Sequence, residues 1–442
     1  MGEYAEYKID TLNIYLRKNE ASAWPFLMEV FAPYELRDIP ENPNVDCGYY
    51  GYVTNVAAAR ERLDVLGYTL DRCFRELRAI LSARLEEINN PPDDYDEDDI
   101  ESLRCDLDGN AIDWESLYAV FSDKQSVAAA FRQVFWDTSV TNRVWTSLWK
   151  RDASPIEIKP VNELAARILS PEGSDLLSLI PTDPLPDPIY LLRIMLEYAR
   201  QDAKVEYDCT LPVRLWDESI ADQLEEYLNG SCFSPSSQII ILTEGSLDDK
   251  VIGDAFKLLR PNIAHLFRFF DHHLVTPERS SSALEKLSRA IISIGLKEKF
   301  IFLFDNDAVG RNSLDKLPRK LPPNMAAIHL PDLALAESYP TIGPDGPSLS
   351  NLNGRAVAIE FFLGRKALIH DDGEYKPVVW TGRDHGIYQG CFEDADKKSA
   401  QATYEAGVKE AFEIGIESSS YDWSGMNQLL DCIVDTAKGL SE

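Results

Sequence analysis

Two short apolar segments of this sequence each run directly into acidic residues. Gln238–Thr243 is followed by Glu244, and Lys299–Phe304 is followed by Asp305 and Asp307. Residues two apart in extended backbone point the same way, so the carboxylates of Asp305 and Asp307 can face one ion. Carboxylate oxygens are the ligands that Mg²⁺ and Mn²⁺ prefer, and clustered acids are unfavourable unless a cation neutralises them. A D-x-D taken alone is usually a loop or a helix cap, but two acidic strand ends together indicate a divalent-metal site.

The residues after Glu244 add a further acid. Gly245 permits a tight turn, and Asp248 falls in the first turn of the helix expected next, facing back towards Glu244. Asp248 also has an ordinary explanation, because an acid at a helix N-terminus interacts favourably with the helix dipole. We assign Asp248, Asp305 and Asp307 to metal coordination. Glu244 is the predicted catalytic residue, either as a metal ligand or as a general acid or base, and the sequence leaves that choice open.

Alternating strands and helices must position these acids. Apolar runs rich in β-branched and aromatic residues predict strands at residues 238–243, 265–270, 299–304 and 325–330. Helices are expected at residues 247–259 and 281–295, and from about residue 312. This alternation predicts a parallel sheet with right-handed crossovers, whose ligands lie at the carboxyl ends of the strands.

The two acidic motifs resemble those of the Toprim (topoisomerase–primase) domain. They read ILTEGSLDDK and FIFLFDNDAVGR and lie about 60 residues apart, which suits a βαβαβ core with an acid plus glycine after the first strand and D-x-D after a later one. The E-G-x-x-D version is most similar to Toprim domains of nucleases of the overcoming-lysogenization-defect type. The resemblance spans about residues 237–370 and implies hydrolysis of phosphodiester bonds with Mg²⁺ or Mn²⁺.

Four further residues are candidates for the site. In the nucleases just named, a later acid within an apolar segment completes the metal site, and AVAIEFFL offers Glu360 here. A place in the core without a ligand role fits Glu360 equally well. Arg311, Lys397 and Lys398 are weaker candidates for contacts to a substrate phosphate. Ordinary surface positions explain these three basic residues at least as well.

The N-terminal half has a different pattern. About the first 35 residues mix Tyr, Leu and Ile with charges, which predicts a short strand or hairpin. Residues 55–88 carry leucines at three- and four-residue spacing, which predicts one long amphipathic helix or two joined near Gly67. The stretch GYVTNVAAARERLDVLGYTLDRC is loosely similar to the N-terminal region of bacterial HEPN/Toprim-associated proteins. That resemblance implies a role in defence against phage or other foreign nucleic acid.

The histidines test one activity of such proteins. HEPN ribonucleases use an Arg-x₄₋₆-His motif, but residues 1–264 contain no histidine. The matching pairs Arg260–His265 and Arg365–His370 both fall in the Toprim-like part, where chance matches to so loose a pattern are common. The N-terminal region is therefore predicted to be a scaffold rather than a ribonuclease.

These patterns predict an α/β protein in which a Toprim-like parallel-sheet βαβ domain follows a mostly helical N-terminal region with a small β element. Four parts are expected. They are the HEPN/Toprim-associated region at residues 1–150, a helical connecting region at 151–236, the catalytic domain at 237–400 and a helical element at 401–442.

Charge limits how such a protein could meet nucleic acid. The 442 residues include 44 Lys and Arg against 74 Asp and Glu, a net charge of −30. Residues 1–236 hold 22 basic and 44 acidic residues, net −22, and residues 237–442 hold 22 and 30, net −8. Binding of nucleic acid through overall positive charge is thereby excluded, so any phosphate handling must be local.

Composition also bears on location. The seven cysteines lack paired short spacing, which fits a reducing cytosol better than a disulfide framework or a zinc site. No apolar run approaches the length of a membrane span, and the start of the chain does not read as a secretory signal. A cytoplasmic protein without membrane contact is expected.

The expected function is a Mg²⁺- or Mn²⁺-dependent nuclease acting on DNA or RNA in bacterial anti-phage defence. Two alternatives stay open: primase-like nucleotidyl transfer, and a non-catalytic regulatory module that docks a partner through its acidic N-terminal half. No G-x-x-x-x-G-K-[ST] loop is present, so an ATPase or another defence protein is a candidate partner in trans. The sequence leaves homo-oligomerisation open.

Overall fold

The structure is a computed structural model that describes residues 4–10, 12–18, 30–39, 49–105, 111–136, 159–168, 189–208, 210, 238–270, 280–384 and 386–440. The chain divides into two units. The first comprises Met1–Asp64 and Tyr68–Ser234, and the second comprises Val65–Gly67 and Pro235–Glu442. The predicted boundaries at residues 150 and 236 lie outside the described residues.

A five-stranded antiparallel sheet lies in the first unit, in the order β2-β1-β5-β4-β3. Its strands are β1 (Tyr4–Ile9), β2 (Leu12–Lys18), β3 (Leu36–Ile39), β4 (Tyr49–Asn55) and β5 (Lys204–Asp208). The central strand β5 comes last in the sequence, and its Tyr207 lies opposite both Tyr7 and Tyr52. The predicted N-terminal hairpin is therefore part of a larger sheet, which needs a strand from far along the chain.

Helices make up most of the rest of the described part of this unit. They are α2 (Val56–Val65), α3 (Leu70–Asn89), α4 (Glu97–Arg104), α5 (Trp114–Ser122), α6 (Lys124–Trp136), α8 (Glu163–Ile168) and α9 (Ile189–Tyr198). Between α2 and α3 the backbone of Gly67 has φ +95°, a conformation that favours glycine. Of the two possibilities predicted for residues 55–88, two helices joined near Gly67 is confirmed.

A buried guanidinium ties α2 to the sheet of this unit. Arg62 has no exposed surface, and its Nη1 donates to the carbonyl oxygen of Val30 at 2.7 Å. Nη1 and Nη2 also donate to the two carboxylate oxygens of Glu35 at 2.7 and 2.9 Å. Thr54, on β4, donates its hydroxyl to the same carboxylate. Losing one partner of such a buried pair leaves the other charge uncompensated.

We therefore expect Arg62→Ala to lower the free energy of unfolding of the first unit by about 3 kcal/mol. Urea denaturation followed by circular dichroism measures the loss. The matched control is Arg75→Ala, because Arg75 is exposed and pairs only with its neighbour Glu76 among the contacts shown, so its loss should be within about 0.5 kcal/mol. Equal effects of the two changes would contradict the structural role of Arg62.

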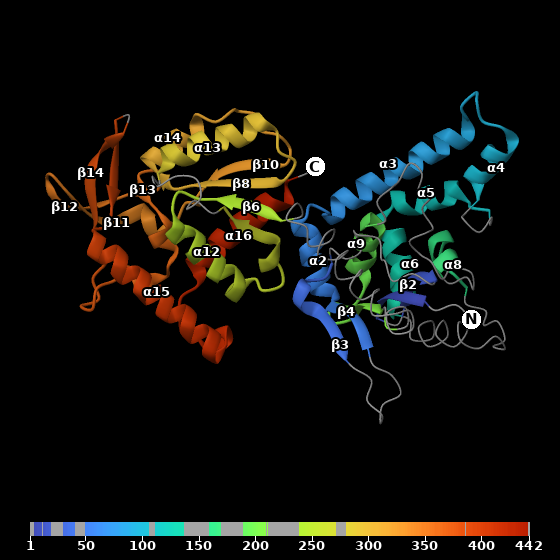
Figure 1. Cartoon of the computed structure of the whole chain (residues 1–442), viewed down its shortest axis with the longest axis horizontal. Helices are drawn as coiled ribbons and strands as arrows, with labels where there is room; N and C mark the ends of the chain where they lie inside the picture. The colour runs from blue at the N-terminus through green and yellow to red at the C-terminus, as the bar shows by residue number, and fades with distance from the viewer. Residues whose placement is uncertain are drawn as a thin grey trace. The chain divides into compact units, whose positions relative to one another are not determined.

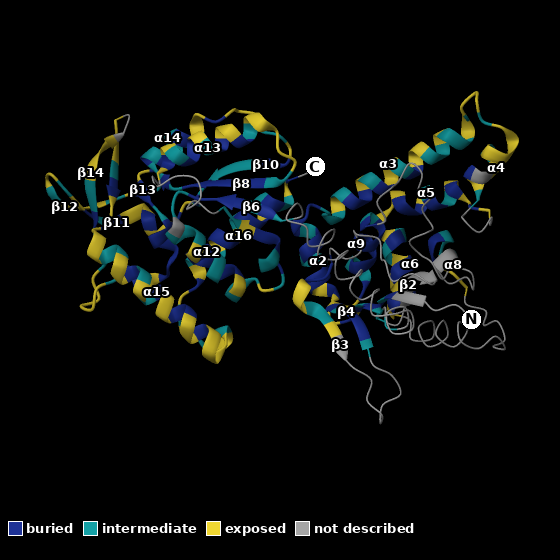
Figure 2. Cartoon of the chain, viewed as in Figure 1, coloured by how far each residue is buried: buried dark blue, intermediate teal, exposed yellow. Residues whose placement is uncertain are grey.

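The second unit is built on a four-stranded parallel sheet in the order β10-β8-β6-β7. Its strands are β6 (Ile239–Leu242), β7 (Phe267–Phe269), β8 (Lys299–Phe304) and β10 (Met325–His329). Figure 2 shows that β6 and β8 are buried. The predicted α/β class with a parallel sheet is confirmed.

Helices cover both faces of this sheet (Figure 1). One face carries α13 (Ser281–Ile294) and α14 (Ala308–Asp315), and the other carries α12 (Ser246–Leu259) and α16 (Ser424–Lys438). Helix α14 begins four residues before the predicted start at about Asn312, because Asp307 caps it directly after the strand. Helix α15 (Asp394–Ile414) begins before residue 401, where the C-terminal helical element was predicted to start.

The second unit also contains a mixed sheet, ordered β12-β11-β14-β15, that was not predicted from the sequence. Its strands are β11 (Tyr339–Gly343), β12 (Gly346–Ser350), β14 (Val378–Asp384) and β15 (Ile387–Cys391). A two-stranded ladder also joins β9 (Asn306–Asp307) to β13 (Ala356–Val357), so residues of the D-x-D motif pair with backbone some 50 residues later. Within the described residues, no helix has both the length and the apolar character needed to cross a membrane.

Candidate metal and catalytic site

The acidic motifs meet at the topological switch point of the parallel sheet, where successive strands are added on opposite sides. From β6 the chain passes through α12 to β7 on one side, whereas from β8 it passes through α14 to β10 on the other. Strands β6 and β8 are neighbours, with Leu242 opposite Phe302. Glu244 and Asp305 follow their carboxyl ends, at the crevice where open α/β sheets bind ligands.

Glu244 joins three elements of the site. Its Oε1 accepts a hydrogen bond from the backbone N–H of Asp305 at 2.9 Å, and its Oε2 accepts one from the hydroxyl of Ser281 at the start of α13. Burial raises the pKa of Glu244, these two hydrogen bonds oppose that rise, and the charge of Asp307 adds to it. Glu244 is thus held by neutral donors, in a place where its protonated form is favoured more than in water.

Asp248 does cap the N-terminus of α12. Its Oδ2 accepts the backbone N–H of Gly245 at 3.1 Å. Burial raises the pKa of Asp248 well above its ordinary value, and the charges of Glu360 and Glu244 raise it further. The two explanations offered by the sequence are therefore compatible: Asp248 caps a helix and also lies within reach of the other acids.

Asp305 is a third acid with a raised pKa. Burial raises its pKa well above the ordinary value, followed by the charges of Glu244, Asp248, Asp307 and Glu360. Within the described part of the chain, no hydrogen bond to its carboxylate offsets this repulsion. The charges of the four other acids therefore act on Asp305 without an offsetting hydrogen bond among the described residues.

Asp307 is the N-cap of α14. Its Oδ1 accepts the backbone N–H of Gly310 at 2.6 Å, and its Oδ2 accepts the side-chain amide of Gln389 at 2.7 Å. Gln389, on β15, in turn accepts the backbone N–H of Val309 at 3.2 Å. A Cβ on Gly310 would lie 2.3 Å from the carbonyl oxygen of Asp305, so only glycine fits against the D-x-D backbone.

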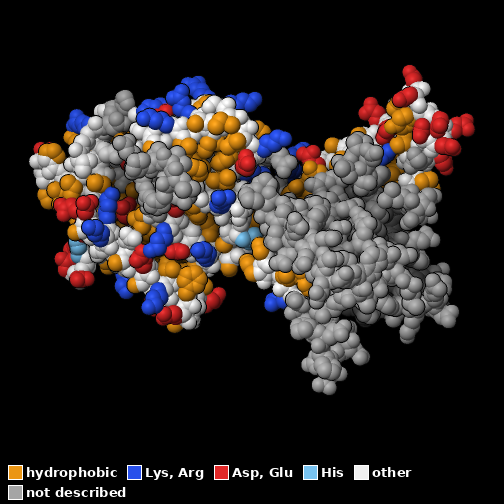
Figure 3. Space-filling model, viewed as in Figure 1, with side chains coloured by type: hydrophobic (Ala, Val, Ile, Leu, Met, Phe, Trp, Pro, Cys, Tyr) orange, Lys and Arg blue, Asp and Glu red, His pale blue; other side chains and the backbone are white. Residues whose placement is uncertain are grey.

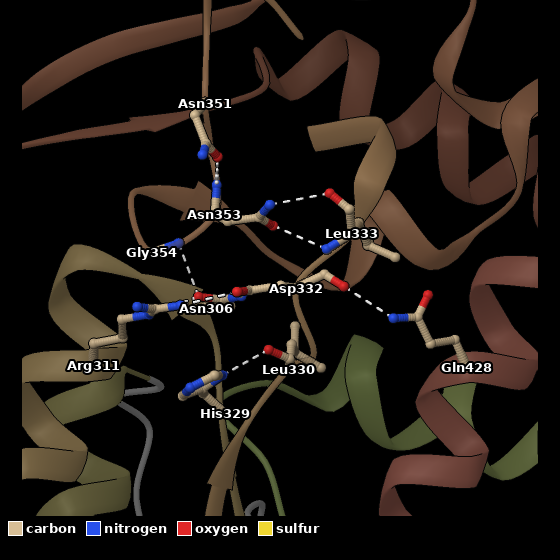
Figure 4. A network of polar contacts seen from close by, with 10 residues as sticks. All are labelled: Asn306, Arg311, His329, Leu330, Asp332, Leu333, Asn351, Asn353, Gly354 and Gln428. Atoms are coloured by element: carbon tan, nitrogen blue, oxygen red, sulfur yellow. Dashed lines mark hydrogen bonds and ion pairs between the residues drawn. The ribbon is translucent and has the colours of Figure 1, made fainter. Parts of the chain in front are cut away.

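The middle residue of the D-x-D motif is anchored by a polar network (Figure 4). Asn306 has no exposed surface, and its amide nitrogen donates to Oδ1 of Asp332 at 2.7 Å. Its amide oxygen accepts from Nε of Arg311 at 2.8 Å and from the backbone N–H of Gly354 at 2.9 Å. Arg311 also donates to Asp332 at 3.0 Å. The guanidinium of Arg311 is thus engaged in holding the motif, and a phosphate contact for it stays a prediction.

A second layer of contacts supports this network. Asn353 donates to the carbonyl oxygen of Leu333 and accepts its backbone N–H, both at 3.0 Å. Gln428, on α16, donates to the carbonyl oxygen of Asp332 at 2.9 Å. The segment after β10, the loop before β13 and helix α16 therefore fix the position of Asn306 jointly.

Glu360 and Lys397 form an ion pair beside the acids. Glu360 is 5% exposed, on a 3₁₀ turn at Ile359–Phe362, and its Oε1 lies 3.6 Å from Nζ of Lys397. Burial would lower the pKa of Lys397, but the charge and hydrogen bond of Glu360 together with the charges of Cys391 and Asp305 outweigh it, and the pKa is raised. Lys398, by contrast, is exposed.

Five carboxylates therefore interact electrostatically: Glu244, Asp248, Asp305, Asp307 and Glu360. Among the described residues, no three His, Cys, Asp or Glu side chains form a ready-made metal-binding group. The donors are hard oxygens, and the raised pKa values of three of them reflect burial and repulsion that a divalent cation would relieve. The chemistry of these residues thus fits Mg²⁺ or Mn²⁺. Because the carboxylates do not form a ready-made group, they would have to move closer together to bind the ion.

Fold and site together define an α/β protein with a carboxylate cluster at the switch point of a parallel sheet. Residues 1–213 match the family model "HEPN/Toprim N-terminal domain 1", which supports the similarity of this part to HEPN/Toprim-associated proteins. No curated protein and no solved structure matches the chain in the corresponding comparisons.

Three side chains that support the site were not predicted from the sequence: Ser281 and Gln389, which bond to acids, and Asp332, which bonds to Asn306. Ser281 stands in a serine run before a predicted helix, which is a capping signal but says nothing of Glu244. Asp332 and Gln389 carry no local signal, because their partners lie 26 and 82 residues away in the chain.

The raised pKa of Asp305 predicts a pH-dependent cost of its charge. Its pKa is higher in the folded than in the unfolded chain, so its stabilising contribution is complete below about pH 4, the ordinary Asp value, and is lost as the pH rises through the folded value. We expect metal-free Asp305→Asn to be more stable than the wild type at neutral pH, by about 1 kcal/mol, with the difference vanishing near pH 4. Thermal unfolding in EDTA at several pH values measures this.

The same variant tests the role of metal. Mg²⁺ or Mn²⁺ should raise the unfolding temperature of the wild type and leave that of Asp305→Asn unchanged, since binding to the folded state alone stabilises it. Asp345→Asn, at an exposed aspartate, serves as the control and should keep the metal response. A wild type that does not respond to either metal would contradict the metal site.

The Asn306 network predicts a loss of metal affinity without contact to the metal. Asn306→Ala should weaken Mn²⁺ binding about 10- to 100-fold, as loss of an outer partner of a ligand commonly does. Asn353→Ala is the matched control, because it removes two contacts of the supporting layer but none to the D-x-D motif. Isothermal titration calorimetry should show reduced affinity in the first variant only. Equal losses in both would reduce Asn306 to a general stabilising role.

Proposed function

We propose that this chain is a divalent-metal-dependent nuclease that hydrolyses nucleic-acid phosphodiester bonds at a Toprim-like carboxylate site. One observation carries the proposal: acids from two neighbouring parallel strands meet at the switch point of the sheet, where burial and the charges of neighbouring acids raise the pKa of Asp305. Such a group is costly to maintain unless a cation and an anionic substrate use it.

In this proposal Asp248, Asp305, Asp307 and Glu360 would hold Mg²⁺ or Mn²⁺. Such an ion would supply activation of water and neutralisation of the charge that develops on the phosphate. Glu244 holds or moves a proton at Oε2, the atom that accepts the hydroxyl of Ser281.

Lys397 supplies positive charge beside the acids. Its Nζ lies 3.6 Å from Glu360, and the charge of Asp305 also raises its pKa. It would remain charged and attract the phosphate into a group that is otherwise negative. Lys398 is exposed on the following position of the same helix and is a weaker candidate for the same role.

The N-terminal unit supports the setting of the proposed activity. Its family description pairs HEPN with Toprim, which suggests a module associated with nucleases. The described residues of this unit contain no histidine, so we place the chemistry in the second unit. We propose a cytoplasmic effector of anti-phage defence, with nucleic acid as substrate and with an ATPase, another defence protein or a second copy as candidate partners.

Incubation of the purified chain with plasmid DNA, single-stranded DNA and tRNA tests the activity. Cleavage should require Mg²⁺ or Mn²⁺, stop in EDTA, and fall at least about 100-fold in Asp305→Ala/Asp307→Ala, which loses two ligands. Asp345→Ala/Asp435→Ala changes charge equally at two exposed positions and should cut like the wild type. Cutting without metal, or cutting retained in the first double variant, would refute the proposal.

Labelled nucleotides in the same assay separate the alternatives. Incorporation on a template, without cleavage, would show primase-like transfer instead. If neither reaction occurs and the metal leaves the unfolding temperature unchanged, a non-catalytic module is the better description.

A further inference from the structure

A positively charged stretch stands out in this acidic chain. Residues 281–320 hold eight Lys and Arg against five Asp and Glu, a net charge of +3, whereas the whole chain carries −30. Two of those five acids are Asp305 and Asp307, which belong to the carboxylate site. Only three acidic residues of this stretch therefore lie outside the carboxylate site.

The fold places the basic residues of this stretch on one surface. Helix α13, helix α14 and the loop after α14 all pack on the same hydrophobic cluster, through Leu284, Ile291, Leu314 and Leu317. Their outward positions carry exposed basic side chains, which we call the α13–α14 basic surface: Lys286, Arg289, Lys316, Arg319 and Lys320. Figure 3 shows Lys and Arg side chains gathered over these two helices.

Four of these five basic residues form no ion pair within the part of the chain that the structure describes. Arg289 pairs with Glu285 at 3.2 Å. Lys286, Lys316, Arg319 and Lys320 have no ion-pair partner among the residues that the structure describes. Unpaired cations on one surface are the electrostatic footprint of an anionic ligand.

Both helices begin at the carboxylate site and lead away from it to the basic surface. Ser281, the first residue of α13, bonds Glu244, and Asp307 caps α14. Lys286 lies five residues beyond Ser281 and Lys316 nine residues beyond Asp307, about 7 and 13 Å along the helices. At 3.4 Å per base pair, this corresponds to about two to four base pairs from a phosphate held at the acids.

We propose that the α13–α14 basic surface binds the phosphate backbone of a nucleic-acid duplex. The bound part is the duplex next to the phosphodiester bond that lies at the carboxylate site. The inference rests on the proposed nuclease function. It adds the substrate form, a duplex, and the direction in which the duplex leaves the site.

Fluorescence anisotropy with DNA and RNA duplexes of about 20 base pairs, in EDTA and across roughly 50–200 mM salt, tests the surface. Lys316→Gln/Arg319→Gln/Lys320→Gln should weaken binding at least about 10-fold and reduce the slope of log K against log salt by about 3. Lys286→Gln should reduce the slope by about 1. The control Lys257→Gln/Lys409→Gln/Lys438→Gln removes three lysines from α12, α15 and α16 and should bind like the wild type.

Tighter binding of the DNA or of the RNA duplex identifies the nucleic acid. Either preference supports the proposed surface if the Lys316→Gln/Arg319→Gln/Lys320→Gln variant binds that duplex more weakly than the wild type. Unchanged affinity and slope in the triple variant, or an equal loss in the control, would overturn the proposal. Preference for single strands that persists in the triple variant would overturn it as well. Because EDTA removes metal, this measurement does not depend on cleavage, so a failure of the nuclease proposal and a failure of this surface give separate results.

Discussion

Repulsion among carboxylates is the constraint on which the second unit depends. Two parallel strands end side by side in acids, a helix start adds Asp248, and a later turn adds Glu360. Keeping such charges together in a half-buried place costs free energy in the absence of a cation. The fold therefore has to hold the acids by contacts that do not themselves cancel their charge.

The contacts to the acids meet this requirement. Glu244, Asp248 and Asp307 accept hydrogen bonds from neutral groups: backbone N–H groups, the hydroxyl of Ser281 and the amide of Gln389. Neutral donors orient a carboxylate and leave its negative charge largely in place. Lys397, the cation in contact with Glu360, offsets only part of the total. An arrangement that orients acids and preserves their charge is suited to a cation that arrives from outside.

The sequence revealed the acids but not the means of holding them. Apolar runs followed by Glu244 and Asp305 are a local signal, since a buried parallel strand and the acid at its end are contiguous. A D-x-D motif is often a helix cap, but the sequence does not show that the helix begins directly after Asp307. That start depends on the close approach of Gly310 to the Asp305 backbone. Gln389 and its sheet could not be predicted from local sequence patterns. Strands β11, β12, β14 and β15 are short, and tertiary contacts set the order in which they pair.

The net charge of the chain takes on a different meaning once it is divided by position. Much of the acidity lies in the N-terminal half, where the run from Asp93 to Asp99 is largely exposed, and the acids of the site are compensable by a metal. The exposed charges on α13 and in the loop after α14 are basic. Since screening limits electrostatic reach to about 10 Å at 0.1 M salt, a local positive surface can attract a phosphate backbone even on a chain of charge −30. In the proposed nuclease, the remaining acidity would work against binding elsewhere and so favour the surface that leads to the carboxylates.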